Sequence, residues 1–142
     1  MRMALLLSLY ENGVCYLQKE TRRELLVAYQ RYLNAFVNED VDTINECVEF
    51  PLTYISDGVV STLDSFPISP AEMKAAKGWA TSENFEIDIV AHSETKAHVL
   101  MRNCRRLRAD GSLIEEASGF YAYKYTADGW KMYAISDIVM PA

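Results

Sequence analysis

The second half of the chain alternates apolar and polar residues with a period of two, and this pattern constrains the fold more than any other feature. From Phe85 to His92, apolar side chains occupy every other position, which is typical of a strand with one buried face. Three further strand-like segments follow at about 97–108, 113–125 and 130–139, and an Ala-Asp-Gly turn precedes each of the last two. Glycine accepts the positive φ of a tight turn at little cost. The pattern therefore predicts a four-stranded antiparallel meander.

Two helices are predicted near the start of the chain. Residues 21–24 form a capping box, in which the threonine hydroxyl and the glutamate carboxylate satisfy exposed backbone amides, and a helical stripe of apolar residues follows to Val37. Asp40 is a natural N-cap for a second, shorter helix that Pro51 ends. Residues 1–20 are predicted to be an extension, either a short strand pair turning at Asn12-Gly13 or an added helix, before a single domain at 21–142.

A hairpin and a third helix separate these two helices from the meander. Residues 52–56 and 59–63 have strand character, and Asp57-Gly58 between them favours a tight turn. Ser69-Pro70-Ala71-Glu72 combines a second capping box with proline at the first helical position, which predicts a helix to about Ala80. The order is helix, helix, hairpin, helix and meander, so the fold class is α+β.

Composition excludes several classes of protein. The chain has 142 residues and a net charge of -6, and an acidic surface repels nucleic-acid phosphates and anionic lipids. No apolar run approaches the roughly 20 residues that span a bilayer. Cys15, Cys47 and Cys104 are widely spaced, which favours reduced thiols in a cytoplasmic protein. His92 and His98 are interpreted as hairpin-edge residues, and we expect no metal and no cofactor.

Several short motifs resemble the nuclear transport factor 2-like superfamily over about residues 20–140. Gln30-Arg31-Tyr32 and residues 40–44 are similar to the first two helices of steroid delta-isomerases. Residues 50–55 and 128–131 resemble uncharacterised members related to polyketide cyclases. The resemblance implies a cone-shaped α+β fold, in which three N-terminal helices pack on a curved antiparallel sheet around a hydrophobic pocket.

Within this superfamily two classes of function stay open. The first is a cofactor-independent isomerase, dehydratase or cyclase, and the second is a non-catalytic dimeric domain for ligand binding or interaction. An isomerase needs a carboxylate base and hydrogen-bond donors for the developing enolate. The resemblance places Tyr32 and, near a second donor position, Tyr121 as donors. It places Ser56 at the position of the base, and Asp57 follows one residue later in the chain. A shift of one residue along a strand turns the side chain to the opposite face. Asp57 is therefore either a turn residue or a base reached through a bulge.

A basic run on one strand faces an acidic pair on the next. The run consists of Arg102, Arg105, Arg106 and Arg108, and the acids are Glu115 and Glu116. A two-residue turn pairs Arg106 with Glu115, whereas a three-residue loop pairs Arg105 with Glu115. The choice also decides whether Phe120 or Tyr121 shares a face with Met101, and the sequence leaves it open.

We expect Tyr54, Asn103 and Arg105 to bind the ligand, which we predict to be a small hydrophobic or weakly anionic molecule. Tyrosines alternate along the strand at 113–125, and such a ladder suits either a pocket wall or a dimer surface. We expect a homodimer through the sheet.

Overall fold

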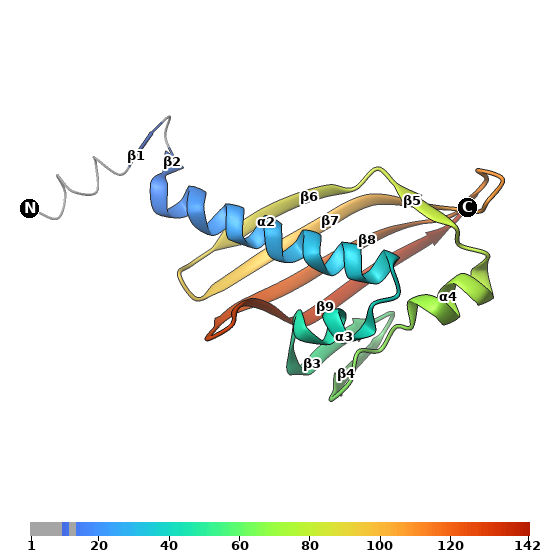
Figure 1. Ribbon diagram of the computed structural model, residues 1–142, viewed down its shortest axis with the longest axis horizontal. Helices are drawn as coiled ribbons and strands as arrows, with labels where there is room; N and C mark the ends of the chain where they lie inside the picture. Colours follow the sequence, from blue (N-terminus) through green and yellow to red (C-terminus); the bar gives the residue numbers. More distant parts are fainter. Residues whose placement is uncertain (1–9, 12–13) are drawn as a thin grey trace, which may run out of the picture.

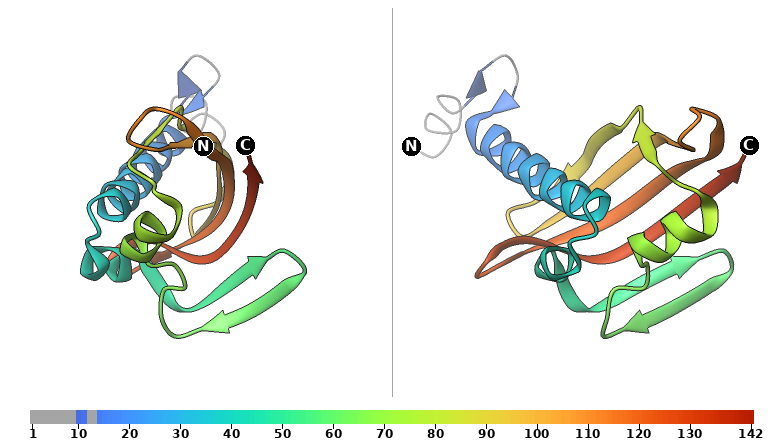
Figure 2. Two further views of the ribbon diagram at one scale, coloured as in Figure 1. Left: turned by 90° about the vertical axis from the view of Figure 1, so that its right-hand side faces the viewer. Right: turned by 45° about the vertical axis from the view of Figure 1, so that its right-hand side comes forward.

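The computed structural model describes residues 10–11 and 14–142 and shows helices packed on one face of a curved sheet (Figure 1). The helices are α2 (Tyr16–Val37), α3 (Val41–Glu46) and α4 (Pro70–Lys77). The main sheet contains β3 (Val48–Ser56), β4 (Val59–Leu63), β5 (Thr81–Glu83), β6 (Glu86–His92), β7 (Lys96–Leu107), β8 (Leu113–Thr126) and β9 (Gly129–Pro141). Seen end-on, the sheet curls around the helices without closing (Figure 2). The predicted α+β cone is confirmed.

The sheet has the order β4-β3-β9-β8-β7-β5, and β6 also pairs with β7. Strands β6 to β9 form the predicted antiparallel meander. Strand β3, however, runs parallel to β9, so the sheet is mixed where an antiparallel sheet was expected. A hairpin would force the two strands to be antiparallel, but α4 and five strands lie between β3 and β9 in the chain and remove that constraint.

The N-terminal part differs from the prediction in where its first helix begins. Strands β1 (Tyr10–Glu11) and β2 (Val14–Cys15) pair with each other, while the predicted turn at Asn12-Gly13 lies outside the described residues. Helix α2 then begins at Tyr16 rather than at the capping box of residues 21–24. Residues 18–20 are Gln, Lys and Glu, which are good helix formers, so nothing interrupts the helix before the box.

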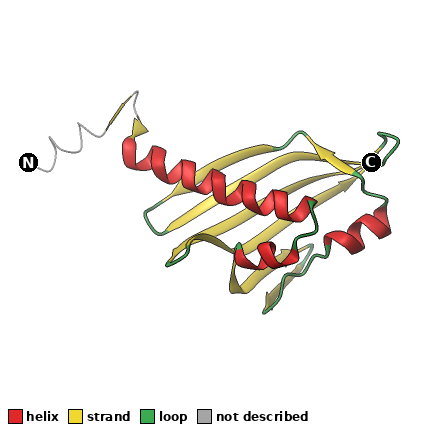
Figure 3. Cartoon of the chain, viewed as in Figure 1, coloured by secondary structure: helices red, strands yellow, loops and turns green. Residues whose placement is uncertain are grey.

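The second and third helices are shorter than predicted. Helix α3 is capped by Asp40 as expected, but it ends at Glu46, and β3 begins before Pro51. Helix α4 has Ser69 as its N-cap, and Gly78 ends it with a φ of 70°. Figure 3 shows both helices as short segments beside the long helix α2.

The core lies between α2 and the concave face of the sheet. The buried side chains of α2 are Leu25, Tyr29, Tyr32, Ala35 and Phe36, whose spacing of three and four residues places them on one helical face. They pack against buried sheet residues that include Tyr121, Tyr123, Met132 and Ile135. This packing fixes the helix across the sheet and leaves a cavity toward the α4 end.

Candidate functional site

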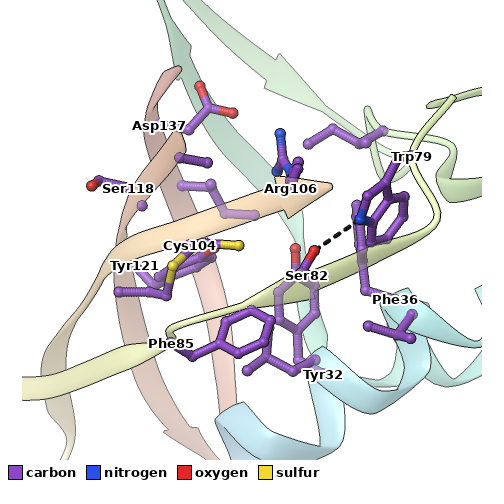
Figure 4. A pocket seen from close by; sticks show the side chains of 17 residues that line it. Tyr32, Phe36, Trp79, Ser82, Phe85, Cys104, Arg106, Ser118, Tyr121 and Asp137 are labelled. Carbon is purple, nitrogen blue, oxygen red and sulfur yellow. Dashed lines mark hydrogen bonds between the residues drawn. The ribbon is translucent and has the colours of Figure 1, made fainter. Parts of the chain in front are cut away.

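A cavity of about 50 Å³ lies between α2 and the sheet. Its apolar wall has five aromatic residues, Tyr32, Phe36, Trp79, Phe85 and Tyr121, and is completed by Leu33, Val37, Ile68, Met101, Ala117, Gly119 and Ile135. The polar groups on its wall, besides the two tyrosines, belong to Ser82, Cys104, Arg106, Ser118 and Asp137. Figure 4 shows Tyr32, Phe36 and Phe85 at one side and Arg106 and Asp137 at the opposite side. The cavity therefore has an aromatic side and a charged side.

Two of the sequence-predicted residues meet in this cavity. Tyr32 comes from α2 and Tyr121 from β8, and their ring centroids are 5.9 Å apart. Tyr29 completes a cluster, with its ring centroid 5.0 Å from that of Tyr121. Burial raises the pKa of both the Tyr32 and the Tyr121 hydroxyl. Both side chains are therefore protonated at neutral pH and available as hydrogen-bond donors.

Gly119 makes room for Tyr121. A Cβ atom at Gly119 would lie 2.7 Å from the Tyr121 hydroxyl oxygen and 2.8 Å from its ring, because the ring folds back over the glycine. Tyr121 is only 5% exposed, so it has little freedom to move aside. Glycine two residues before a buried tyrosine on one strand is the sequence signal for this close approach, which the sequence analysis missed.

The carboxylate in the cavity belongs to Asp137, which the sequence analysis also missed. The Tyr54 hydroxyl donates a hydrogen bond to Asp137 Oδ2 at 2.8 Å. Burial, and then the neighbouring Asp137 carboxylate, raise the pKa of Tyr54 well above its usual value. Tyr54 thus orients the carboxylate and stays protonated. The signal was an aspartate two residues after buried Ile135 in a strand that alternates.

Asp57 lies away from these groups. It is exposed at the turn between β3 and β4, and the strand pairing reaches Ser56 and Val59 on either side of it. Gly58 supplies the positive φ of that turn, 74°. The structure therefore does not bring Asp57 to the two tyrosines, and the wall of the cavity contains Asp137 instead.

A bulge in β7 decides which arginine faces the cavity. Met101 pairs with Gly119 and Cys104 with Ala117, so β7 has one more residue than β8 between these pairs. Asn103 lies in this bulge with a φ of 58°, a conformation that asparagine tolerates better than most residues. The extra residue reverses the alternation, so Arg106 lines the cavity.

Neither Asn103 nor Arg105 lines the cavity. Asn103 is exposed, and the Arg105 guanidinium pairs with Glu83 at 3.2 Å and with Glu116 at 3.9 Å on the other side of the strand. Plain alternation from Met101 would place residues 103 and 105 on its face, and the bulge overturns this pattern. The preference of asparagine for a positive φ was the available signal for the bulge.

The open question of register is resolved by a second bulge. The Arg108 N–H donates to the Ser112 carbonyl at 2.9 Å, so residues 109–111 form a three-residue loop. That loop alone would pair Arg105 with Glu115, but β8 has an extra residue at Ile114, and Arg106 pairs with Glu115. Tyr121 shares the inner face with Met101.

Glu115 holds Arg106 in place. Its carboxylate accepts from Lys77 Nζ at 2.6 Å and from Arg106 Nη1 at 3.2 Å, and the Glu115 side chain is only 5% exposed. Burial by itself raises the pKa of Glu115, but the two cations outweigh it and hold the pKa below its usual value. Glu115 is therefore ionised at neutral pH and links α4 to the cavity wall.

Comparison with known proteins defines the class of fold. No family model matches the sequence, and no curated protein matches it significantly. Several solved structures match this chain over most of their own length. Their sequence identities to it are so low that the likeness shows the fold and nothing more. The chain has the nuclear transport factor 2-like fold.

Three of these structures show the range of the class. A conserved protein from Planctomyces limnophilus has a TM-score of 0.64 at 12% identity, covering 87% of this chain and 99% of its own. A nuclear transport factor 2-like protein of unknown function from Shewanella oneidensis has a TM-score of 0.59 at 16% identity, covering 82% of this chain and 97% of its own. A protein from Shewanella frigidimarina, named as a candidate ketosteroid isomerase, has a TM-score of 0.55 at 13% identity, covering 78% of this chain and 91% of its own.

The described residues contain neither a metal-binding cluster nor a membrane-spanning helix. No group of three His, Cys, Asp or Glu side chains within 10–11 and 14–142 is arranged to hold a metal ion. No helix in that part of the chain is long and apolar enough to cross a membrane.

Proposed function

We propose that this protein binds a small, largely apolar molecule in the cavity and catalyses a proton transfer on it without a cofactor. The observation that carries the proposal is the joint presence, around one cavity, of the Asp137 carboxylate and the protonated Tyr32 and Tyr121 hydroxyls. A base and hydrogen-bond donors in one water-poor site are what enolisation requires.

In this reaction Asp137 removes a proton from the carbon next to a substrate carbonyl. The electron pair of the broken C–H bond moves to the carbonyl, and Tyr121 or Tyr32 donates a hydrogen bond to the enolate oxygen that forms. The protonated carboxyl then returns the proton to the same carbon or to another carbon of the conjugated system. Tyr54 positions the carboxylate through its 2.8 Å hydrogen bond.

The size of the cavity limits the substrate. Pockets for drug-sized ligands have volumes of roughly 300–1,000 Å³, whereas this cavity has about 50 Å³. A steroid does not fit that space, and a ligand with a single ring requires the side chains that line it to move apart. The likeness to a candidate ketosteroid isomerase therefore supports the type of chemistry and not the substrate.

The test is exchange of carbon-bound protons for deuterium, followed by proton NMR with cyclohexanone and phenylpyruvate as probes. The wild-type protein should accelerate exchange of at least one probe, and Asp137→Asn should lower that rate by about a hundredfold or more. Tyr121→Phe should lower it less. Asp57→Asn is the matched variant: if the loss follows Asp57 instead, Asp57 is the base. A wild-type protein that accelerates neither probe refutes the proposal.

We also propose that the outer face of the sheet forms a homodimer. Phe120 and Ile138 point to this face, since their neighbours Tyr121 and Asp137 point inward, and they are 37% and 66% exposed. A second copy would cover them. Light scattering checks this, because a species near 16 kDa is a monomer. A cytoplasmic location is part of the proposal and is supported by the free, buried thiols of Cys47 and Cys104.

A further inference from the structure

Arg106 presents hydrogen-bond donors to the cavity. Its side chain is 15% exposed, and among the described residues the carboxylate that pairs with it is that of Glu115, which also pairs with Lys77. The side chain of Lys77 is 40% exposed, so water solvates its charge, and the buried pair of Arg106 and Glu115 is neutral. Arg106 donates to Glu115 from Nη1, and a guanidinium has five N–H donors, so further donors can bind an oxyanion in the cavity.

Asp137 lies at a different level of the sheet from Arg106. In the β8 pairing, Asp137 is level with Gly119, whereas Arg106 is level with Glu115, four residues away. At a rise of about 3.3 Å per residue, these two levels lie roughly 13 Å apart along the strand. The Asp137 carboxylate accepts from Tyr54. The cavity thus has two charged positions, a carboxylate near the tyrosines and a guanidinium toward α4.

Trp79 and Phe36 form a flat aromatic part of the cavity wall. Trp79 is fixed there by its indole N–H, which donates to the Thr81 carbonyl at 2.9 Å and to Ser82 Oγ at 2.8 Å (Figure 4). Phe36 packs on Trp79 with ring centroids 5.7 Å apart. Rigid aromatic walls favour a planar apolar ligand body, and a guanidinium favours a planar oxyanion.

We propose that the ligand of this cavity is a small carboxylate with a flat apolar body, whose carboxylate pairs with Arg106 and whose body lies toward Tyr32 and Tyr121. This inference rests on the cavity being the functional site proposed above and adds the class of its substrate. Glu115 and Lys77 are positioning residues, because they hold the guanidinium and do not contact the ligand.

The test compares three probes of one shape that differ in charge: phenylacetate, the neutral 2-phenylacetamide and the cationic phenethylamine. Titration calorimetry on the full chain should give phenylacetate a Kd at least tenfold below that of the amide, and no measurable binding of the amine. Arg106→Gln should remove the preference for the carboxylate. Arg105→Gln is the matched control, since its side chain lies on the opposite side of the same strand, and it should keep the preference.

Replacing a buried arginine can also destabilise the fold, so a second variant is needed to separate loss of binding from loss of folding. The double variant Arg106→Gln/Glu115→Gln removes both partners of the buried pair and leaves no uncompensated carboxylate. It should fold, as judged by circular dichroism, and bind phenylacetate no better than the amide. Equal binding of phenylacetate and the amide by the wild type, absence of binding by either, or loss of preference in Arg105→Gln as large as in Arg106→Gln each overturns the inference.

Failure of this inference and failure of the proposed function have different signatures. Binding of phenylacetate needs no proton transfer, so Asp137→Asn should keep the preference for the carboxylate. Exchange of cyclohexanone without any preference for carboxylates supports the proton transfer and refutes the ligand class. Preference for phenylacetate without exchange of either probe supports the ligand class and refutes the proton transfer.

Discussion

Two neighbouring ion pairs link β7 to β8, and they have the same chemistry in opposite surroundings. Arg105 pairs with Glu116 and Arg106 with Glu115. The first pair is more than a third exposed at both side chains, and its closest atoms are 3.9 Å apart. The second has only 15% and 5% of its side chains exposed and a contact of 3.2 Å. One residue along a strand therefore separates a solvated surface pair from a buried pair at the cavity.

The difference teaches that burial, and not residue type, sets the energetic importance of a charge. Exposed ion pairs contribute about 0–1 kcal/mol, since water and salt screen them. Breaking a buried pair leaves an uncompensated charge, which costs several kcal/mol. The same asymmetry is the reason why we propose Arg106, and not Arg105, as the anion-binding residue.

The largest expected effect comes from removing the buried carboxylate. Glu115→Gln leaves Lys77 and Arg106 without a counter-charge and should lower the free energy of unfolding by about 2–3 kcal/mol, somewhat less than for a fully buried pair because Lys77 is partly exposed. Glu116→Gln is the matched variant and should change it by less than about 0.5 kcal/mol. Urea denaturation measures both. Equal effects of the two variants would break the comparison.

The stability that Glu115 contributes should decrease as the pH is lowered. The pKa of Glu115 in the folded protein lies below its usual 4.5, because Lys77 and Arg106 favour the ionised form. Its stabilisation is therefore fully present above about pH 5 and is lost as the pH falls through the lower, folded-state pKa. The stability difference between the wild type and Glu115→Gln should be constant from pH 6 to 8 and shrink below pH 4.5. A difference that grows on acidification contradicts the assignment.

A smaller effect is expected at the bulge that separates the two pairs. Asn103 has a φ of 58°, where a β-branched side chain is disfavoured and glycine is not. Asn103→Val should therefore destabilise the protein by about 1–2 kcal/mol, and Asn103→Gly should stay within about 0.5 kcal/mol of the wild type. Thermal unfolding of the two variants checks this. Equal stability of the valine variant would mean that the bulge does not need the positive φ.

The smallest effect is expected at the exposed pair. Arg105→Gln should cost at most about 0.5 kcal/mol at low salt. Even this difference should vanish in 1 M salt, where the screening length is about 3 Å. The denaturation midpoints of wild type and variant at the two salt concentrations measure it. A cost that persists in high salt would show that Arg105 contributes more than a screened surface interaction.

Much of the fold was predictable because its signals are local. The meander follows from alternation and from the Ala-Asp-Gly turns, and the caps of α3 and α4 follow from Asp40 and Ser69. The start of α2 was not predictable, because a capping box marks a favourable first residue but does not prevent the helix from beginning earlier in the chain. The resemblance also selected Tyr32 and Tyr121, which do line the cavity.

The sequence by itself determined the elements, their order and the aromatic character of the site, since each is encoded within a few neighbouring residues. Only the tertiary structure decided which charges reach the cavity. The bulge at Asn103 placed Arg106 inside and Arg105 outside, and the bulge at Ile114 paired Glu115 with Arg106. Asp137 faces inward because it continues the alternation from buried Ile135, but the pairing of β9 with β3 and β8 decided that this face lines the cavity. Strand pairing joins residues far apart in the chain, so local preferences suggest these positions without selecting them.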